Sequence, residues 1–268
     1  MHPLLDLTAH PIIAHRGASG ERPENTLPSF ERAVELGADA LEFDVRLTAD
    51  GEVVVMHDPT VDRTTDLTGP VRIHPLAELR AADAGFRFTP DRGTTFPFRG
   101  RGVRIPTLED VLARFPAMPV LLELKEVVGQ EKVRDLLSRH GAEARCVIAS
   151  EHHDALTAFR GGRFRLAASG REIFRFWRAS VIESAPPPVD YHVLSVPKRH
   201  RLLPVVTRNV LAHARRLGIP VHVWTINDPR TAQKLWRKGV NGIITNWPGR
   251  IAAPKGEERE KDSGLRWG

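Results

Sequence analysis

Short apolar or β-branched runs alternate with amphipathic helical stretches along most of the chain, as in repeated βα units around a parallel sheet. Helices are expected after most of the runs, at Leu27–Leu36, Glu131–His140, Thr207–Leu217 and Pro229–Lys238, and a glycine follows each of them as a stop signal. The eight runs that fit strands lie near residues 11–15, 39–46, 119–125, 145–150, 164–169, 191–196, 220–226 and 241–245. This repetition predicts an α/β fold with a parallel sheet.

A ninth strand-like run, at residues 52–57, follows the second strand after a turn that is too short for a parallel crossover. It is therefore expected to return antiparallel to the second strand. With a two-residue turn, the register pairs Val55 with Asp44 and places His57 opposite Glu42. The prediction is an imidazole beside a carboxylate.

Residues 59–106 break the βα rhythm and are rich in glycine and proline, so we expect an inserted subdomain or lid after the second strand. The whole region 11–250 is interpreted as one catalytic domain, preceded by a short segment at 1–10. The end of the chain, 251–268, is dense in charge and poor in apolar residues, which predicts a disordered tail.

The chain has 268 residues, of which 41% are hydrophobic, and this length suits one αβ barrel better than two domains. Its net charge of +6 would suit an anionic ligand, a nucleic acid or a membrane surface, without choosing among them. A single cysteine, Cys146, excludes a disulfide within the chain and lies in an apolar run typical of a buried position. Because no apolar run is long enough for a signal peptide or a membrane span, we expect a cytoplasmic protein.

Polar residues at strand ends are where chemistry is expected, because these ends open into the mouth of such a barrel. In the second strand, Glu42 and Asp44 are two residues apart and share a face. Two carboxylates that face inward together repel each other unless a cation neutralises them. A divalent metal ion would do so, and this is the favoured interpretation; the alternative is that arginines neutralise both carboxylates or that they lie on a solvated face.

The third strand repeats this spacing with Glu123 and Lys125. Glu123 completes a possible site of three carboxylates, and ligation by oxygen alone favours Mg²⁺ or Ca²⁺ over zinc. Lys125 would then meet a phosphate oxygen. Taken alone, these two residues could also form a structural ion pair.

Two further strand ends carry candidate residues. The first strand ends in His15-Arg16-Gly17, and a lone histidine there could simply be satisfied by a backbone carbonyl. Near the end of the seventh strand, Trp224 would form either a wall of the substrate pocket or part of the core. His222 shares its face but lies deeper, so we expect it to be structural.

Together these residues resemble the glycerophosphodiester phosphodiesterase family, and the resemblance runs from about Ile12 to Pro248. It rests on ten segments in order and not on one short motif. The segments are Ala14-His15-Arg16-Gly17, Pro23-Glu24-Asn25-Thr26, Glu42-Phe43-Asp44-Val45, His57-Asp58, Asp62-Arg63-Thr64-Thr65, Asp83-Ala84-Gly85, Ile105-Pro106-Thr107-Leu108, Glu123-Leu124-Lys125, Val223-Trp224-Thr225-Ile226-Asn227 and Gly242-Ile243-Ile244-Thr245.

The resemblance implies a distorted (β/α)₈ barrel of the TIM type that hydrolyses glycerophosphodiesters, which are deacylated phospholipids, to sn-glycerol 3-phosphate and an alcohol. It implies one divalent metal ion, Mg²⁺ or Ca²⁺, and a role in lipid and glycerol metabolism. By similarity, the residues with implied roles are His15 and His57 as acid and base, Glu42, Asp44 and Glu123 as metal ligands, Arg16 and Lys125 as phosphate-binding residues, and Glu24, Asn25 and Asn227 as supporting residues.

Two positions depart from the family pattern. Asn246 stands where many relatives carry an aspartate, and Glu151 follows Ser150 where an aromatic residue is more usual. We expect neither to touch the metal ligands or the histidines, so that only the shape of the pocket would change.

Several alternatives stay open at this point. The nucleophile is water or the glycerol 2-hydroxyl, and the roles of the two histidines are not assigned. A lysophospholipase D would use the same centre but needs an apolar channel, which the four phenylalanines Phe86, Phe88, Phe96 and Phe98 could line. A noncatalytic binder of nucleic acid fits less well, because the basic residues are spread among acidic ones and the histidines would be unexplained. Neither nucleic acid nor stable membrane insertion is expected, and the oligomeric state is left open.

Overall fold

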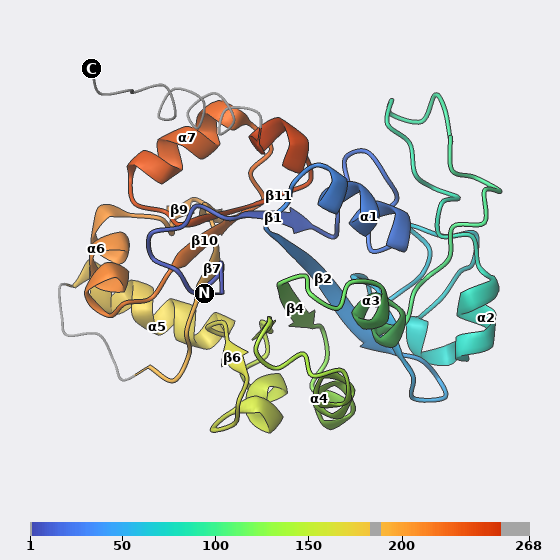
Figure 1. The fold of residues 1–268 in the computed structure, drawn as a ribbon, viewed down its shortest axis with the longest axis horizontal. Helices are drawn as coiled ribbons and strands as arrows, with labels where there is room; N and C mark the ends of the chain where they lie inside the picture. The colour runs from blue at the N-terminus through green and yellow to red at the C-terminus, as the bar shows by residue number, and fades with distance from the viewer. Residues whose placement is uncertain (1, 183–188, 253–268) are drawn as a thin grey trace, which may run out of the picture.

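The computed structural model describes residues 2–182 and 189–252, and its centre is a ring of eight parallel strands (Figure 1). All eight predicted strands are present, which confirms the α/β barrel. They are β1 (Ile12–His15), β2 (Ala40–Leu47), β4 (Val120–Leu124), β5 (Cys146–Ala149), β6 (Arg165–Leu166), β7 (Leu194–Pro197), β10 (Val221–Trp224) and β11 (Gly242–Thr245).

The strands follow the order β6-β5-β4-β2-β1-β11-β10-β7 in the sheet. A parallel bridge between Ala167 and Val193 joins the two ends of this order, and the Ala168 amide donates a hydrogen bond of 2.9 Å to the Val193 carbonyl. The ring is therefore closed where β6 leads towards β7. Because all eight strands are parallel, their carboxyl ends lie at one end of the ring.

Alternate residues of each strand face the inside and the outside of the ring. On β2, Leu41, Phe43 and Val45 join the core between the sheet and the surrounding helices, as predicted. A second, separate apolar cluster combines residues of the strands and their ends with the segment before β1: Leu4, Ile13, Ala40, Leu121, Val147, Ala167, Val193 and Ile244. Leu4 precedes the first strand and is fully buried, so the amino-terminal segment closes the bottom of the barrel.

The four predicted helices are present, and each ends before its glycine as expected. They are α1 (Leu27–Glu35), α4 (Gln130–Arg139), α6 (Arg208–Arg216) and α7 (Pro229–Arg237). Between β5 and β6 the connection is the 3₁₀ segment η2 (His153–Phe159), and α5 (Gly170–Val181) links β6 to β7. A small hairpin, β8 (Arg199–His200) and β9 (Leu203–Pro204), follows β7. Among the described residues, no helix is both long and apolar enough to span a bilayer.

The antiparallel return strand β3 (Val53–Val55) is present, but the predicted register was wrong by one residue. Val55 lies opposite Val45 and not opposite Asp44. The paired strand also ends at Val55, so His57 is not held opposite Glu42 by the hairpin.

The length of the loop explains the error. The Gly51 amide donates to the Thr48 carbonyl at 3.1 Å, and the Thr48 amide donates to the Glu52 carbonyl at 2.9 Å. Gly51 has a φ of +76°, which gives a three-residue loop that ends in a left-handed glycine. A two-residue loop at Ala49 and Asp50 would need positive φ at both residues, a conformation that neither adopts.

The segment 59–106 contains η1 (Val71–Ile73) and α2 (Leu76–Ala81) and lies to one side of the barrel (Figure 1). It packs its own small apolar core, which also includes Val54 and Met56 at the end of the hairpin. The chain then returns to the barrel through α3 (Leu108–Arg114), which begins with a capping box at Thr107.

Two further predictions concern other parts of the chain. Cys146 is fully buried in the core, and burial raises the pKa of its thiol to about 12, as expected for an inert structural cysteine. Of the predicted disordered tail at 251–268, residues 253–268 lie outside the described residues.

Candidate active site

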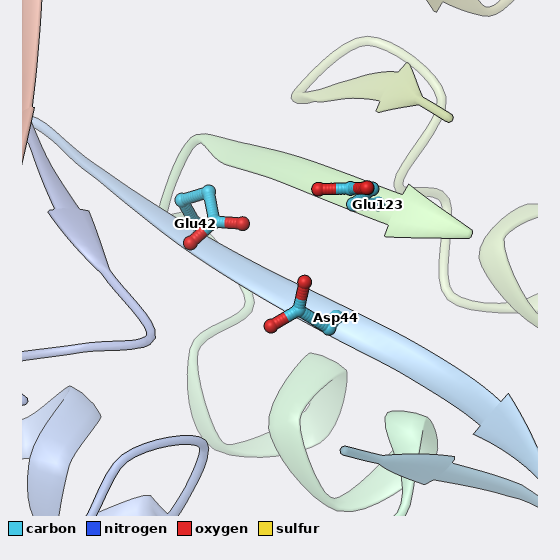
Figure 2. A group of neighbouring side chains, drawn as sticks. All are labelled: Glu42, Asp44 and Glu123. Carbon is cyan, nitrogen blue, oxygen red and sulfur yellow. The ribbon is translucent and has the colours of Figure 1, made fainter. Parts of the chain in front are cut away.

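Three carboxylates meet on neighbouring strands at the carboxyl-terminal end of the barrel (Figure 2). Glu42 and Asp44 are two residues apart on β2, and Glu123 lies on β4 directly opposite Asp44. Glu42 is 5% exposed and Asp44 is 1% exposed. One ligand oxygen from each of the three residues lies within 4.8 Å of the other two. The structure thus brings together the carboxylates that the sequence placed on inward faces.

Two basic side chains neutralise part of this cluster. Lys125 Nζ lies 3.0 Å from Asp44 Oδ1 and 2.7 Å from Glu123 Oε1, and Arg16 Nε lies 3.2 Å from Asp44 Oδ2. Although burial opposes ionisation, Lys125 and Arg16 hold the pKa of Asp44 below its usual range. Burial and the charges of Asp44 and Glu123 raise the pKa of Glu42 well above its usual range. The cluster therefore carries more negative charge than its two cations neutralise.

The donor set fits a hard divalent cation. The three residues offer only carboxylate oxygens, which Mg²⁺ and Ca²⁺ prefer, and neither histidine nor cysteine belongs to the cluster. Burial also raises the pKa of Glu123, so that an added positive charge would favour its ionised form and that of Glu42. The arrangement has the chemistry of a metal site.

His15 ends β1 and contacts Asn246, which follows β11. Its Nδ1 lies 2.6 Å from Asn246 Oδ1, and its Nε2 lies 4.0 Å from Glu42 Oε2. Burial and the neighbouring Arg16 lower the pKa of His15 to about 4, so its imidazole is neutral at pH 7. The expectation that Asn246 touches neither histidine was wrong, because β1 and β11 pair directly and bring their ends together.

His57 is oriented by an adjacent carboxylate. Its Nδ1 lies 2.6 Å from Asp58 Oδ1. Although burial disfavours its charge, hydrogen bonds from Arg63 and His57 lower the pKa of Asp58 to about 2. Asp58 is therefore ionised at neutral pH and accepts a hydrogen bond from His57 Nδ1. The Arg46 side chain also donates to the His57 carbonyl at 2.9 Å. The imidazole is thus fixed from both its side chain and its backbone.

A chain of ion pairs links the surroundings of the two histidines. Arg63 contacts Asp58 and donates two hydrogen bonds to Glu24, of 2.7 and 2.8 Å. Glu24 accepts another from Arg16 at 2.9 Å, and Arg16 donates its backbone amide to Glu42 Oε2 at 3.0 Å. Glu24 therefore acts as a support for Arg16 and Arg63.

The other predicted supporting residues lie behind the reacting groups. Asn25 Nδ2 donates to Asp44 Oδ2 at 3.0 Å and is buried. Asn227 Oδ1 accepts a hydrogen bond of 2.9 Å from the backbone amide of Asn246, and so helps to position Asn246 against His15. His222 is fully buried below the site, and its Nε2 lies 2.9 Å from the Leu4 carbonyl, which matches the structural role expected for it.

A cavity of about 740 Å³ opens above the carboxylates. Its polar side carries His15, Arg16, Glu42, His57, Glu123 and Lys125, and Trp224 lines it from β10. Its apolar side comes from α5 and the β8–β9 hairpin, through residues such as Ile173, Phe174, Trp177 and Leu203. None of Phe86, Phe88, Phe96 and Phe98 lines it, so the segment 59–106 does not supply an apolar channel here.

Comparisons with known proteins agree with this geometry. Residues 15–250 match the model of the glycerophosphoryl diester phosphodiesterase family. The chain belongs to this family. It is 32% identical over 247 residues to the glycerophosphodiester phosphodiesterase of Caldanaerobacter subterraneus, with 88% of this chain and 94% of that protein covered. Membership identifies the chain as a phosphoric diester hydrolase, as the sequence predicted.

Two other relatives bear on the substrate. A solved structure of an Oleispira antarctica phosphodiesterase, in complex with the product sn-glycerol-3-phosphate, has a TM-score of 0.72 and 26% sequence identity, covering 92% of this chain and 97% of that chain. The lysophospholipase D GDPD1 of Homo sapiens is 25% identical over 272 residues, covering 89% of this chain and 84% of that protein. The chain thus resembles proteins named for two kinds of phosphodiester substrate.

Three residues that hold the histidines in place had no role predicted from the sequence: Asp58, Arg63 and Asn246. Asp58 and Arg63 lay within the resembling segments, and the adjacent histidine and aspartate of His57-Asp58 were a usable signal for an oriented imidazole. Asn246 gave no local signal, because its contact with His15 joins residues 231 positions apart.

If the three carboxylates bind Mg²⁺ or Ca²⁺, either ion should raise the melting temperature of the metal-free protein. At about one hundred times Kd the expected rise is roughly 5 °C or more, because the ion binds only the folded chain. The Glu123→Gln variant should lose most of this rise in a thermal shift assay. Glu151→Gln, in the same cavity but outside the cluster, should keep it, and equal rises for both variants would rule out Glu123 as a ligand.

Proposed function

We propose that this chain hydrolyses glycerophosphodiesters to sn-glycerol 3-phosphate and an alcohol, with His15 and His57 transferring the protons. The observation that carries this proposal is the lining of one cavity by two oriented histidines, two phosphate-binding cations and the carboxylate cluster. The product named for the Oleispira antarctica structure supports the glycerol 3-phosphate half of the substrate.

Arg16 and Lys125 are suited to hold the phosphate. Both line the cavity, and both are held by carboxylates of fixed position, so their charges are preorganised before the substrate arrives. A divalent ion held by Glu42, Asp44 and Glu123 would supply further stabilisation of the negative charge on the phosphate oxygens. The family resemblance and the donor set support this metal dependence, and either Mg²⁺ or Ca²⁺ fits the oxygen ligands.

The two histidines suit opposite roles. His15 is neutral at pH 7, and its Nδ1 faces the Asn246 side-chain oxygen, so Nε2 is the nitrogen that can accept a proton from the nucleophile. His57 has the Asp58 carboxylate at Nδ1, which orients the ring and leaves Nε2 to meet the leaving alcohol. We therefore assign His15 as the base and His57 as the acid that protonates the leaving alcohol. Water or the glycerol 2-hydroxyl serves as the nucleophile.

A second candidate function is a lysophospholipase D reaction at the same centre. The apolar side of the cavity, formed by α5 and the β8–β9 hairpin, favours it, because an acyl chain needs such a wall. The lysophospholipase D of Homo sapiens that resembles this chain supports the same reading. A cytoplasmic location and a small-molecule substrate stay predictions from the sequence.

Replacing either histidine tests the main proposal. His15→Ala and His57→Ala should each lower the release of glycerol 3-phosphate from glycerophosphocholine by at least about a hundredfold, because a general base or acid is lost. A coupled assay for glycerol 3-phosphate measures this, and circular dichroism checks the fold. His140→Ala, just after the end of α4 and outside the cavity, is the matched control and should behave as wild type. Near wild-type turnover by either cavity variant would overturn the assignment.

The Asn246→Asp variant tests which histidine is the base. A carboxylate at Nδ1 raises the pKa of His15, and a base must be neutral to accept a proton. The acidic limb of the plot of kcat/KM against pH should therefore move to higher pH in this variant. An unchanged acidic limb in an active variant would contradict the assignment of His15 as the base.

Comparing two substrates separates the two candidate functions. If lysophosphatidylcholine is a substrate, Leu203→Gln should lower kcat/KM for it about tenfold, because the apolar wall is lost, and leave glycerophosphocholine hydrolysis near wild type. Equal effects on both substrates, or no hydrolysis of lysophosphatidylcholine at all, would argue against the lysophospholipase D reading. Both outcomes are read in one assay for glycerol phosphate and its acylated form.

A further inference from the structure

A patch of exposed apolar and basic side chains borders the mouth of the cavity. We call it the rim patch. It comprises Arg171, Phe174, Arg175 and Arg178 of α5, Lys198 just before the β8–β9 hairpin, and Arg199, His200, Arg201, Leu202 and Leu203 of the hairpin. All of these residues are exposed.

The apolar residues of the rim patch are unusually accessible. Leu202 is 90% exposed, Phe174 is 60% exposed and Leu203 is 55% exposed. Leu202 is the most exposed of the large hydrophobic side chains that the described residues contain. Its position between the two short strands makes it the tip of the hairpin. A leucine at such a tip, beside an exposed phenylalanine, indicates contact with an apolar medium.

Basic residues flank these apolar side chains along α5 and along the hairpin. On α5, Arg171, Phe174, Arg175 and Arg178 follow the spacing of three, four and seven residues that defines one helix face. Among the described residues, no carboxylate forms an ion pair with the three arginines of this face or with the basic residues of the hairpin. Glu172, the acidic residue of α5, is paired with Arg160. The rim patch is thus strongly positive.

The helix and the hairpin are held together as one surface. Trp177 Nε1 of α5 donates a hydrogen bond of 3.1 Å to the Pro204 carbonyl of β9. Phe174 stacks on Trp177, with ring centroids 6.4 Å apart. Arg171, Phe174, His200 and Leu203 also line the cavity, so the rim patch continues into the site.

We propose that the rim patch docks the protein on the surface of an anionic lipid bilayer, with Leu202 and Phe174 entering the headgroup region and the basic residues facing lipid phosphates. Exposed apolar side chains flanked by cations suit the surface of an anionic bilayer, where negatively charged headgroups cover an apolar interior. This binding is peripheral and needs no spanning helix. It goes beyond the hydrolysis itself and would place the cavity mouth beside lipid-derived substrates.

A second copy of the chain is a poorer occupant of the same surface. In a symmetric dimer the rim patch would face itself and bring its cations against one another. The nearby acidic residues Glu172 and Asp190 are already paired with Arg160 and cannot offset that repulsion. An anionic bilayer supplies the opposite charge, so charge complementarity selects the lipid surface.

Sedimentation of the full chain with extruded vesicles tests the proposal. At low salt, wild type should bind vesicles of phosphatidylcholine mixed with phosphatidylglycerol, bind vesicles of pure phosphatidylcholine far less, and dissociate as salt is added. Arg175→Glu/Arg199→Glu should lower the partition coefficient at least tenfold, since each cation near the surface contributes about fivefold. Leu202→Gln should lower it about threefold or more.

The matched control is Arg237→Glu/Lys238→Glu at the carboxyl-terminal end of α7, which changes the net charge equally but lies outside the rim patch. It should bind like wild type. Absence of binding by wild type, or an equal loss in the control, would overturn the proposal. So would a salt-resistant dimer that Leu202→Gln dissociates, because that result assigns the patch to a second copy.

Turnover of glycerophosphocholine is followed in parallel, since the four replaced positions and Leu202 do not line the cavity. Normal turnover with lost binding separates this inference from the proposed function.

Discussion

The repulsion among Glu42, Asp44 and Glu123 is the constraint on which the rest of the centre depends. Three carboxylates share a small volume inside the barrel, and two of them are almost completely buried. Such a cluster is stable only with compensating positive charge. Arg16 and Lys125 provide part of it, and a divalent cation would provide the rest. The centre therefore favours the binding of a further positive charge.

The same cations also organise the surroundings of the two histidines that we propose as acid and base. Arg16 contacts Asp44 and Glu24, and Glu24 leads through Arg63 to Asp58 and so to His57. His15 is set from the other side by Asn246 at the end of β11. Each charged side chain is fixed by an ion pair or hydrogen bond to a neighbour that has a further partner of its own. We therefore expect these side chains to move little when the charge on a bound phosphate changes.

The cavity differs between its two sides because different parts of the chain build them. The polar side comes from β1, β2 and β4, where strand ends carry ionisable residues, whereas α5 and the β8–β9 hairpin supply the apolar side. The segment 59–106 packs its own core and contributes to the centre mainly through Arg63. Variation in α5 and the hairpin can therefore alter what lies beside the phosphate without disturbing the residues that act on it.

The sequence by itself determined the eight strands, the helices that end at glycines and the strand-end residues from His15 to Trp224, because these depend on local periodicity and on residues two positions apart. Only the tertiary structure decided the one-residue shift of the hairpin, which depends on the backbone of Gly51. It alone brought Asn246 to His15 and linked Arg63 to Glu24, and it moved the apolar wall from the four phenylalanines to α5. These contacts join residues far apart in the chain, and spacing along a sequence carries no information about which of them closure of the barrel brings together.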